Sequence, residues 1–272
     1  RTGSAQRKHS TGSNTSTMSI PIIAASSLSA AGSIERNSSE ALAALLQRGM
    51  PFVLTGAIEA WPSVTWSAGA LSSQFGDVNV VVRLHPRSMP GETRRYYEGE
   101  CAYEAVPLRE FCSWLTQSEA TQRLPSRKGY VGYADYQDMI GAFPQDALDA
   151  IDWSFATGAV RNGAHSILWL GSEGAHTPTH FDAYGCNLVA QLVGTKRWLL
   201  HPPSAAIVPS RVPYEESSIF ARDGADAGGD LPSAVGVDLR PGDVLHVPKH
   251  WWHTVSTLTS HSARFPVRTE PW

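Results

Sequence analysis

The pattern of hydrophobic and polar positions divides the chain into three parts. Residues 1–19 are rich in Ser, Thr and Gly and almost lack large apolar side chains. Such a segment cannot offset the entropy cost of ordering, so we expect a disordered tail or a non-native remnant there. Residues 20–150 mix helix-like and strand-like patterns and are expected to form an α/β segment that packs on a barrel. Residues 151–272 carry the barrel itself.

In five segments of the middle part, the pattern of apolar residues predicts a helix or a strand. Residues 38–50, SSEALAALLQRGM, show helical spacing, with Ser38 or Ser39 as the N-cap and Gly49 as the stop. Strands are expected in 51–62 and 78–86, and helices in 107–115 and 146–151. Residues 129–136, GYVGYADY, read as an aromatic strand or loop.

The last part consists of short apolar runs separated by Gly and Pro, which favours a sandwich or barrel over βαβ units. We expect strands within 166–172, 179–184, 187–194, 196–203, 234–248 and 251–255. The runs at 187–194 and 196–203 predict a hairpin around Gly194 and Thr195.

A His, one spacer and an Asp stand in one of these expected strands, at His180 and Asp182. Residues two apart on a strand point to the same face, while Phe181 points to the other. Burying two polar groups is costly unless each finds a partner, which a simple His–Asp hydrogen bond or a divalent metal would provide. His253 lies at the start of another expected strand. Two His and one carboxylate with open positions opposite them are typical of non-haem Fe(II) oxygenases, and the absence of a nearby thiolate argues against structural zinc.

Composition narrows the class of protein. The 272 residues are 42% hydrophobic, which is enough for a large core, and the net charge is −3, so a nucleic acid would need a local basic patch. No apolar run is long enough for a membrane span or a signal peptide. Cys101, Cys112 and Cys186 are odd in number and lack metal-type spacing. We expect free thiols and a cytoplasmic or nuclear protein rather than a secreted one.

Two stretches together resemble a known family. LWLGSEGAHTPTHFDAYGCNLVAQLVGTKRWLLHPP at 168–203 and RPGDVLHVPKHWWHTV at 240–255 are similar to the JmjC family of Fe(II)- and 2-oxoglutarate-dependent oxygenases, and within it to the small JmjC-only hydroxylases. Residues 49–71 match the segment that precedes the barrel in these proteins. The resemblance implies a double-stranded β-helix, a cupin-like jelly roll, with His180, Asp182 and His253 as the iron ligands.

The same resemblance implies a site for 2-oxoglutarate. Lys196 matches the lysine that pairs with the distal carboxylate, and Thr177 matches a hydroxyl donor to it. Asn187 matches an amide near the metal-bound end. Tyr130 is our choice for a tyrosine donor, with Tyr133 second. Each residue also has an ordinary structural interpretation. Lys196 could be a solvated residue of a hairpin, Thr177 and Asn187 could be polar residues of turns, and the tyrosines could pack in the core.

The implied activity is hydroxylation of a C–H bond, with O2 as oxidant, on a protein side chain or, alternatively, a tRNA base. Without a reader domain or zinc module, histone demethylation is less favoured. A cupin-like binding protein that has lost turnover is the main alternative. A cupin isomerase or dioxygenase that does not use 2-oxoglutarate is another, against which Lys196 argues. Specificity is expected in the loop at 209–232.

The end of the chain departs from the family pattern. Residues 256–272, STLTSHSARFPVRTEPW, lack the expected alternation, and Pro266 is expected to interrupt a central strand. We therefore expect a truncated or diverged final strand and a barrel that closes poorly.

Overall fold

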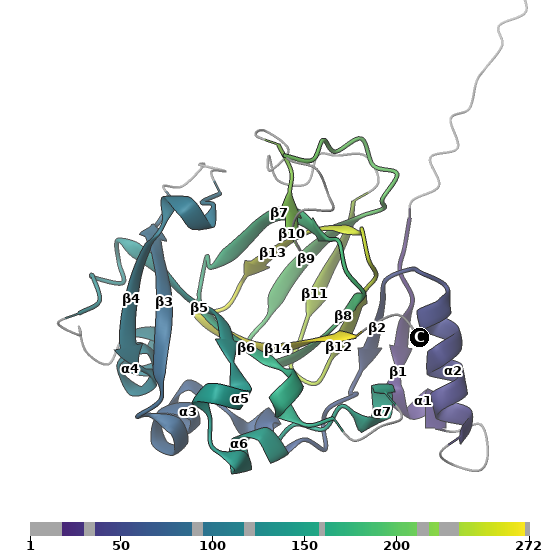
Figure 1. Ribbon diagram of the computed structural model, residues 1–272, viewed down its shortest axis with the longest axis horizontal. Coiled ribbons are helices and arrows are strands. Elements are labelled where there is room, and N and C mark those ends of the chain that lie inside the picture. The colour runs from purple at the N-terminus through teal and green to yellow at the C-terminus, as the bar shows by residue number, and fades with distance from the viewer. Residues whose placement is uncertain are drawn as a thin grey trace, which may run out of the picture.

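Two β-sheets face each other and enclose the middle of the molecule (Figure 1). The computed structural model describes residues 18–29, 36–88, 95–116, 123–157, 161–210, 218–222 and 234–269. The expected tail at 1–19 and much of the loop at 209–232 lie outside these residues. Apart from β1 with β2, every strand pairing is antiparallel. The architecture is the expected mainly β jelly roll.

The larger sheet has nine strands in the order β1 (Ile22–Ala24), β2 (Phe52–Thr55), β12 (Val244–Val247), β8 (Cys186–Val193), β14 (His261–Thr269), β6 (Ile167–Ser172), β5 (Tyr130–Asp138), β3 (Asn79–Pro86) and β4 (Ala102–Pro107). The smaller sheet has five, in the order β10 (Ser218–Phe220), β7 (His176–Asp182), β13 (Trp252–Thr257), β9 (Lys196–His201) and β11 (Val235–Leu239). Five of the nine strands in the larger sheet, β1 to β5, come from the segment up to residue 150.

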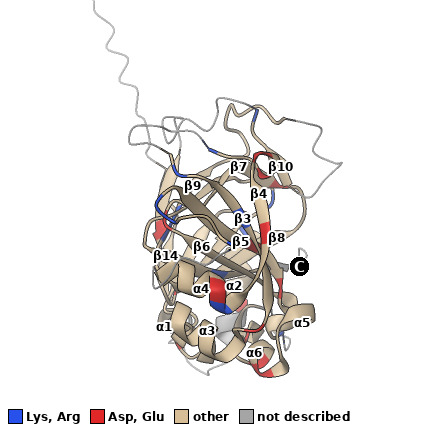
Figure 2. Cartoon of the chain, turned by 90° about the vertical axis from the view of Figure 1, so that its left-hand side faces the viewer, with Lys and Arg blue, Asp and Glu red and all other residues tan. Residues whose placement is uncertain are grey.

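Helices cover one side of the larger sheet and its edge near β1 (Figures 1 and 2). They are α1 (Ala25–Ser29), α2 (Arg36–Gln47), α3 (Ala68–Phe75), α4 (Leu108–Thr116), α5 (Met139–Ala142), α6 (Gln145–Asp149) and α7 (Ser154–Thr157), with 3-10 turns η1 (Pro62–Thr65), η2 (Glu98–Glu100) and η3 (Gly163–His165). One buried apolar cluster runs from Leu42 on α2 to Phe265 on β14. The two halves of the chain therefore share one core.

The helix predicted at 38–50 is present, but its beginning is not where the sequence suggested. Because α2 is already helical at Arg36, the prediction that Ser38 or Ser39 is the N-cap was wrong. Gly49 does follow the helix with φ +61°, a left-handed conformation that glycine adopts without steric cost.

The predicted hairpin at Gly194 and Thr195 was wrong. β8 pairs with β12 and β14 in the larger sheet, whereas β9 pairs with β11 and β13 in the smaller one. The two residues carry the chain from one sheet to the other. Gly194 has φ +69°, and a Cβ there would meet the backbone oxygen of His261 at 2.2 Å, so the crossing requires glycine.

The expectation of an interrupted final strand was also wrong. β14 pairs with β6 from His261 to Arg264 and with β8 from Ala263 to Thr269, Pro266 included. Pro266 is tolerated because its ladder with β6 has already ended at Arg264, which leaves one side of the strand without a neighbour at this position. Phe265 beside it is fully buried. The strand closes the larger sheet between β8 and β6.

The structure bears on two expectations from composition, which concern the cysteines and membrane-spanning segments. Cys101, Cys112 and Cys186 are free thiols. Among the described helices, none combines the length and the apolar character that crossing a membrane would take.

Candidate active site

His180, Asp182 and His253 lie together inside the barrel, as the sequence predicted. β7 and β13 are neighbours in the smaller sheet, and His253 stands directly opposite His180 in their register. The three side chains are buried, and one possible ligand atom from each lies within 4.8 Å of the others. Phe181 points away and packs against Trp252 in a separate apolar cluster. The alternation along β7 thus separates the polar face from the packed face.

Hydrogen bonds orient both imidazoles in the same way. Nδ1 of His180 lies 2.9 Å from the carbonyl oxygen of Pro178, and Nδ1 of His253 lies 2.9 Å from that of Trp251. A carbonyl oxygen can only accept, so each Nδ1 carries the proton and donates. Each Nε2 is left with a lone pair, which is the form that binds a metal.

The carboxylate of Asp182 is held on both of its oxygens. Ser218 donates to Oδ1 at 2.9 Å, and the amide of Asn187 donates to Oδ2, which also lies 3.7 Å from Nε2 of His253. Burial alone would raise the pKa of Asp182, but the imidazoles of His253 and His180 and the two hydrogen bonds hold it below its ordinary value. The carboxylate is therefore ionised and fixed in direction.

This donor set fits a divalent transition metal. Burial, together with the neighbouring His180, lowers the pKa of His253 to about 3, so its imidazole is neutral near pH 7. Two imidazole nitrogens and one carboxylate suit Fe(II), and they also suit Mn(II). The partners of the ligands, namely Ser218, Asn187 and two carbonyls, form the supporting hydrogen-bond shell that metal sites need.

Strand irregularities coincide with the site. The register shifts between His253 and Val255 on β13, between Ala263 and Arg264 on β14, and between Ala134 and Gln137 on β5. A β-bulge changes the direction of a side chain relative to a regular ladder. Each of these three bulges adjoins or contains a residue of the cavity described next.

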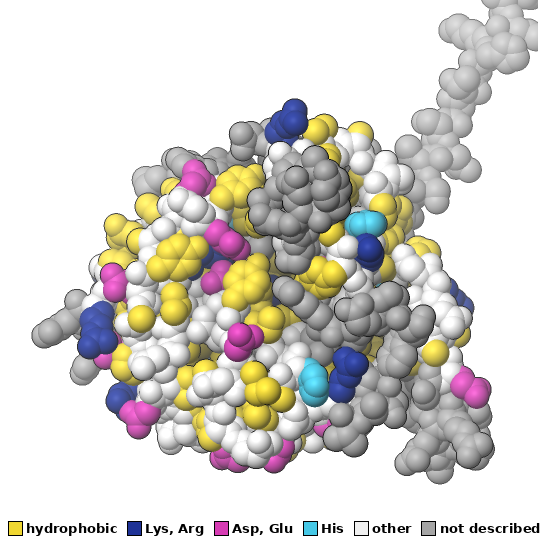
Figure 3. Space-filling view, viewed as in Figure 1, with side chains coloured by type: hydrophobic (Ala, Val, Ile, Leu, Met, Phe, Trp, Pro, Cys, Tyr) yellow, Lys and Arg dark blue, Asp and Glu magenta, His cyan; other side chains and the backbone are white. Residues whose placement is uncertain are grey.

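A cavity extends from the triad across the barrel. Its walls include Thr177, Asn187, Trp169, Trp198 and Arg264. Tyr136, the most exposed residue of its lining, has φ +52° and packs on Trp169 with ring centroids 4.4 Å apart. A non-glycine residue in this conformation is uncommon and is found often at functional sites. Figure 3 shows the face of the molecule that is turned to the viewer in Figure 1. On this face, hydrophobic side chains lie beside acidic and basic ones.

Lys196 lies at the far end of the interior, with Tyr133. Lys196 is fully buried, and its Nζ donates to the Tyr133 hydroxyl at 2.9 Å. Arg264 points at the same hydroxyl, 3.4 Å away. Burial, with Arg264 nearby, lowers the pKa of Lys196 well below its ordinary value. Two basic side chains thus converge on one neutral oxygen, and the lowered pKa disfavours the charged form of Lys196 while no anion lies beside it.

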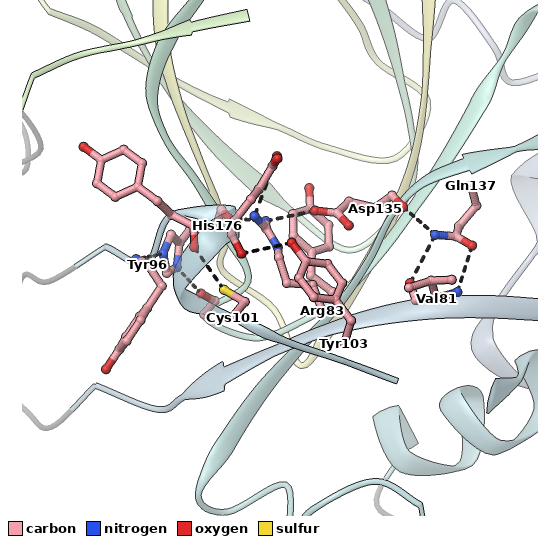
Figure 4. A network of polar contacts seen from close by, with 12 residues as sticks. Val81, Arg83, Tyr96, Cys101, Tyr103, Asp135, Gln137 and His176 are labelled. Carbon is pink, nitrogen blue, oxygen red and sulfur yellow. Dashed lines mark hydrogen bonds and ion pairs between the residues drawn. The ribbon is translucent and has the colours of Figure 1, made fainter. Parts of the chain in front are cut away.

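The carboxylate of Asp135 is already engaged elsewhere. It pairs with Arg83 at 3.0 Å, and Arg83 also donates to the backbone oxygen of His176 at 3.1 Å (Figure 4). Burial raises the pKa of Asp135 to about 6, which Arg83 partly opposes. The carboxylate of Asp135 is therefore engaged by Arg83, and neither Lys196 nor Arg264 forms an ion pair with a carboxylate among the described residues.

Of the four predicted cosubstrate residues, Thr177 and Asn187 line the cavity, whereas Lys196 and Tyr130 are not among its lining residues. Thr177 lines the cavity, and its buried hydroxyl has no hydrogen-bond partner among the described residues. Asn187 lines the cavity beside Asp182. Tyr130 is 37% exposed at the start of β5, and neither Tyr130 nor the second choice, Tyr133, is among the residues that line the cavity. Since Tyr130 and Tyr133 are three apart on a strand, they face opposite sides, and Tyr133 is the one inside.

Sequence reasoning missed Arg264 and Ser218. Arg264 stands between Ala263 and Phe265 in a strand, where a charged residue is unusual, and that signal was lost because Pro266 argued against a strand at all. Ser218 lies in the loop at 209–232, whose composition carries no sign that one of its residues holds Asp182.

Comparison with known proteins agrees with this geometry. Residues 38–268 match the family model of the cupin-like domain. The chain is 36% identical over 223 residues to HSPB1-associated protein 1 of Homo sapiens, an alignment that covers 76% of this chain and 45% of that protein. It is 26% identical over 221 residues to lysine-specific demethylase JMJ30 of Arabidopsis thaliana, covering 78% and 48%. With Jumonji C domain-containing protein 5 of Drosophila melanogaster the identity is 26% over 235 residues, covering 80% and 55%.

The chain spans about half the length of these relatives. The match to the cupin-like domain covers most of the chain, and two of the three relatives, those of Arabidopsis thaliana and Drosophila melanogaster, carry a Jumonji name. The fold, the buried His-Asp-His cluster and the matched residues agree with one another. The chain belongs to the cupin-like domain family, in its JmjC branch.

Proposed function

We propose that this domain is an Fe(II)- and 2-oxoglutarate-dependent oxygenase that hydroxylates a C–H bond of a protein side chain. The observation that carries the proposal is the buried triad of His180, Asp182 and His253, whose ligand atoms lie within 4.8 Å of one another beside a cavity that Arg264 lines. The JmjC family generally uses this metal and this cosubstrate.

Each residue has a defined task in that proposal. The triad would hold Fe(II), and Lys196 with Thr177 would hold the distal carboxylate of 2-oxoglutarate. When bound, the metal supplies the redox chemistry in which O2 and 2-oxoglutarate give succinate, CO2 and one hydroxyl group on the substrate carbon. Among the described residues the Thr177 hydroxyl has no hydrogen-bond partner and neither Lys196 nor Arg264 pairs with a carboxylate, which supports a dicarboxylate there.

The rest of the site excludes water and orients the substrate. Trp198 and Val255 are buried apolar walls next to His253, and they keep the reacting centre out of bulk solvent. Asn187 and Ser218 keep Asp182 in one orientation. No side chain needs to act as a general acid or base.

A protein substrate is favoured over a tRNA base. The name HSPB1-associated protein 1 describes that relative as one that associates with a protein. The net charge of −3 offers no excess of basic residues for RNA, and Figure 2 shows acidic as well as basic residues along the described part of the chain. The three free cysteines support a reducing compartment, the cytoplasm or the nucleus.

The test is an anaerobic titration of the protein with Fe(II), followed by 2-oxoglutarate. A visible charge-transfer band should appear in the wild type and be absent in Asp182→Ala. Asp238→Ala, which removes an exposed carboxylate on β11, is the control and should keep the band. Admission of O2 should then convert 2-oxoglutarate to succinate. A folded wild type that binds Fe(II) but shows neither band nor succinate would instead be a binding protein built on the same barrel.

A further inference from the structure

Arg264 is a buried cation on the wall of the cavity. Its side chain is 4% exposed and lies between two indole rings, with its guanidinium carbon 4.5 Å from the ring centre of Trp169 and 4.8 Å from that of Trp198. Such stacking holds a guanidinium plane in one orientation and contributes cation–π attraction. Arg264 lies on the opposite face of β14 from its neighbours Ala263 and Phe265, which belong to the large apolar cluster, and it pairs with Trp169 of β6 in a regular ladder.

The hydrogen bonds of Arg264 are incomplete within the described chain. One terminal nitrogen points at the Tyr133 hydroxyl at 3.4 Å, while Nε is buried and has no partner there. A buried guanidinium donor without an acceptor is costly. Thr177 Oγ1 and Trp198 Nε1, on the same cavity wall, are also buried without partners.

Charge is unbalanced at the same place. Lys196 and Arg264 approach the one neutral hydroxyl of Tyr133, and neither forms an ion pair with a carboxylate among the described residues. Asp135 is paired with Arg83 at 3.0 Å. Burial beside the Arg264 guanidinium lowers the pKa of Lys196, and a carboxylate placed against both side chains would remove the cost of charging Lys196 there. The cavity reaches Arg264, whereas Lys196 is fully buried, so an anion entering from the metal side meets Arg264.

We propose that Arg264 binds the distal carboxylate of the cosubstrate directly, as a second cation beside Lys196, and so makes the site select a 2-oxo dicarboxylate over a 2-oxo monocarboxylate. This inference rests on the proposed function. A guanidinium presents two parallel N–H donors that match the two oxygens of a carboxylate. A 2-oxo acid that ends in a methyl group would leave both cations and the Thr177 hydroxyl unsatisfied, which is how polar sites reject apolar analogues.

The test measures binding rather than turnover. The wild type, Arg264→Met and Arg264→Lys are loaded anaerobically with Mn(II) and titrated with 2-oxoglutarate and with 2-oxovalerate, which lacks the distal carboxylate. Calorimetry gives the affinities, and tryptophan emission reports on the guanidinium between Trp169 and Trp198. Arg197→Met is the matched control, since Arg197 lies on β9 next to Lys196 but is exposed and paired with Asp238 at 2.7 Å.

We expect Arg264→Met to weaken 2-oxoglutarate binding by about 10- to 100-fold, as for loss of a charged hydrogen-bonding partner. The affinities for Mn(II) and for 2-oxovalerate should not change, so the preference for the dicarboxylate should fall by the same factor. Arg264→Lys keeps the charge but loses the bidentate contact with the carboxylate. Its affinity for 2-oxoglutarate should lie between those of the wild type and Arg264→Met. The change in tryptophan emission on binding should disappear in Arg264→Met and persist in Arg197→Met.

Unchanged 2-oxoglutarate affinity in a folded Arg264→Met protein would overturn this inference and leave the proposed function standing. Should that variant fail to fold, full wild-type affinity in Arg264→Lys would overturn it equally. A wild type that binds Mn(II) but neither oxo acid is a different result, because it removes the proposed function on which the inference rests.

Discussion

Nζ of Lys196, on β9 of the smaller sheet, donates a hydrogen bond to the hydroxyl of Tyr133, on β5 of the larger sheet, at 2.9 Å. The contact bridges the two sheets across the interior of the barrel. Both residues are buried, and burial raises the pKa of Tyr133, so the phenol is neutral and keeps its proton. The hydroxyl accepts from Lys196, which leaves its own proton free to be donated to an anion.

Removing that hydroxyl should destabilise the protein. Tyr133→Phe leaves Lys196 without its buried acceptor, and we expect the free energy of unfolding to fall by about 1–3 kcal/mol. Urea denaturation at pH 7.5 measures it. Tyr130→Phe is the control, because Tyr130 is partly exposed at the start of the same strand, and it should change stability by less than about 0.5 kcal/mol. Equal effects of the two changes would contradict the assignment of Tyr133 to the interior.

The amide of Asn187 should tune metal affinity. Because Asn187 donates to the carboxylate of Asp182, Asn187→Ala is expected to weaken Mn(II) binding by roughly 10- to 100-fold while the fold is kept. Asp182→Ala should abolish binding. Titration followed by the electron paramagnetic resonance signal of free Mn(II) measures both. Asn162→Ala, which removes the cap of η3, should bind as the wild type does. Wild-type affinity in Asn187→Ala would show that the hydrogen bond does not orient the ligand.

The burial of His246 should make the free energy of unfolding fall in mild acid. Burial lowers its pKa to about 4, and its Nδ1 lies 3.2 Å from the carbonyl oxygen of Met50. The unfolded chain, with a histidine pKa of about 6.5, binds more protons than the folded one between these values, so stability is lost as the pH falls from about 6.5 toward 4.

From pH 7.5 to pH 5 this single group should remove about 2 kcal/mol of stability. His246→Phe retains a ring against Phe52, which lies 4.7 Å from the imidazole, and removes the titration. Urea unfolding at both pH values should therefore show a loss that is smaller by that amount in the variant. Identical losses in the two proteins would mean that His246 does not stay neutral in the folded state.

A side chain at Gly194, where the chain passes from one sheet to the other, should destabilise the protein. Gly194→Ala places a Cβ 2.2 Å from the backbone oxygen of His261 in a left-handed conformation, and we expect a loss of about 2–5 kcal/mol. Gly49→Ala has a similar φ of +61° but meets nothing within 4 Å, so about 1–2 kcal/mol should be lost. Thermal and urea unfolding of both variants separate crowding from backbone strain. Equal losses would leave no role for the close approach of His261.

Local chemistry made the metal triad predictable. His180 and Asp182 share a face because a strand has a period of two, and this holds wherever the strand is placed. His253 could be proposed because its neighbourhood resembled a known family. The strands themselves were readable from apolar runs between Gly and Pro. These features depend on a few consecutive residues, so the sequence by itself determined them.

Pairing between distant strands decided the rest. Whether β8 and β9 form a hairpin or enter opposite sheets depends on competition with β11, β12, β13 and β14, which no local pattern reveals. Pro266 is acceptable because β6 ends beside it, a fact about another strand. Tyr133 and Arg264 reach Lys196 from the other sheet, and their meeting is a consequence of how the two sheets close on each other. The cluster of Lys196, Tyr133 and Arg264 is therefore a property of tertiary structure, because its members come from three strands that are remote in sequence.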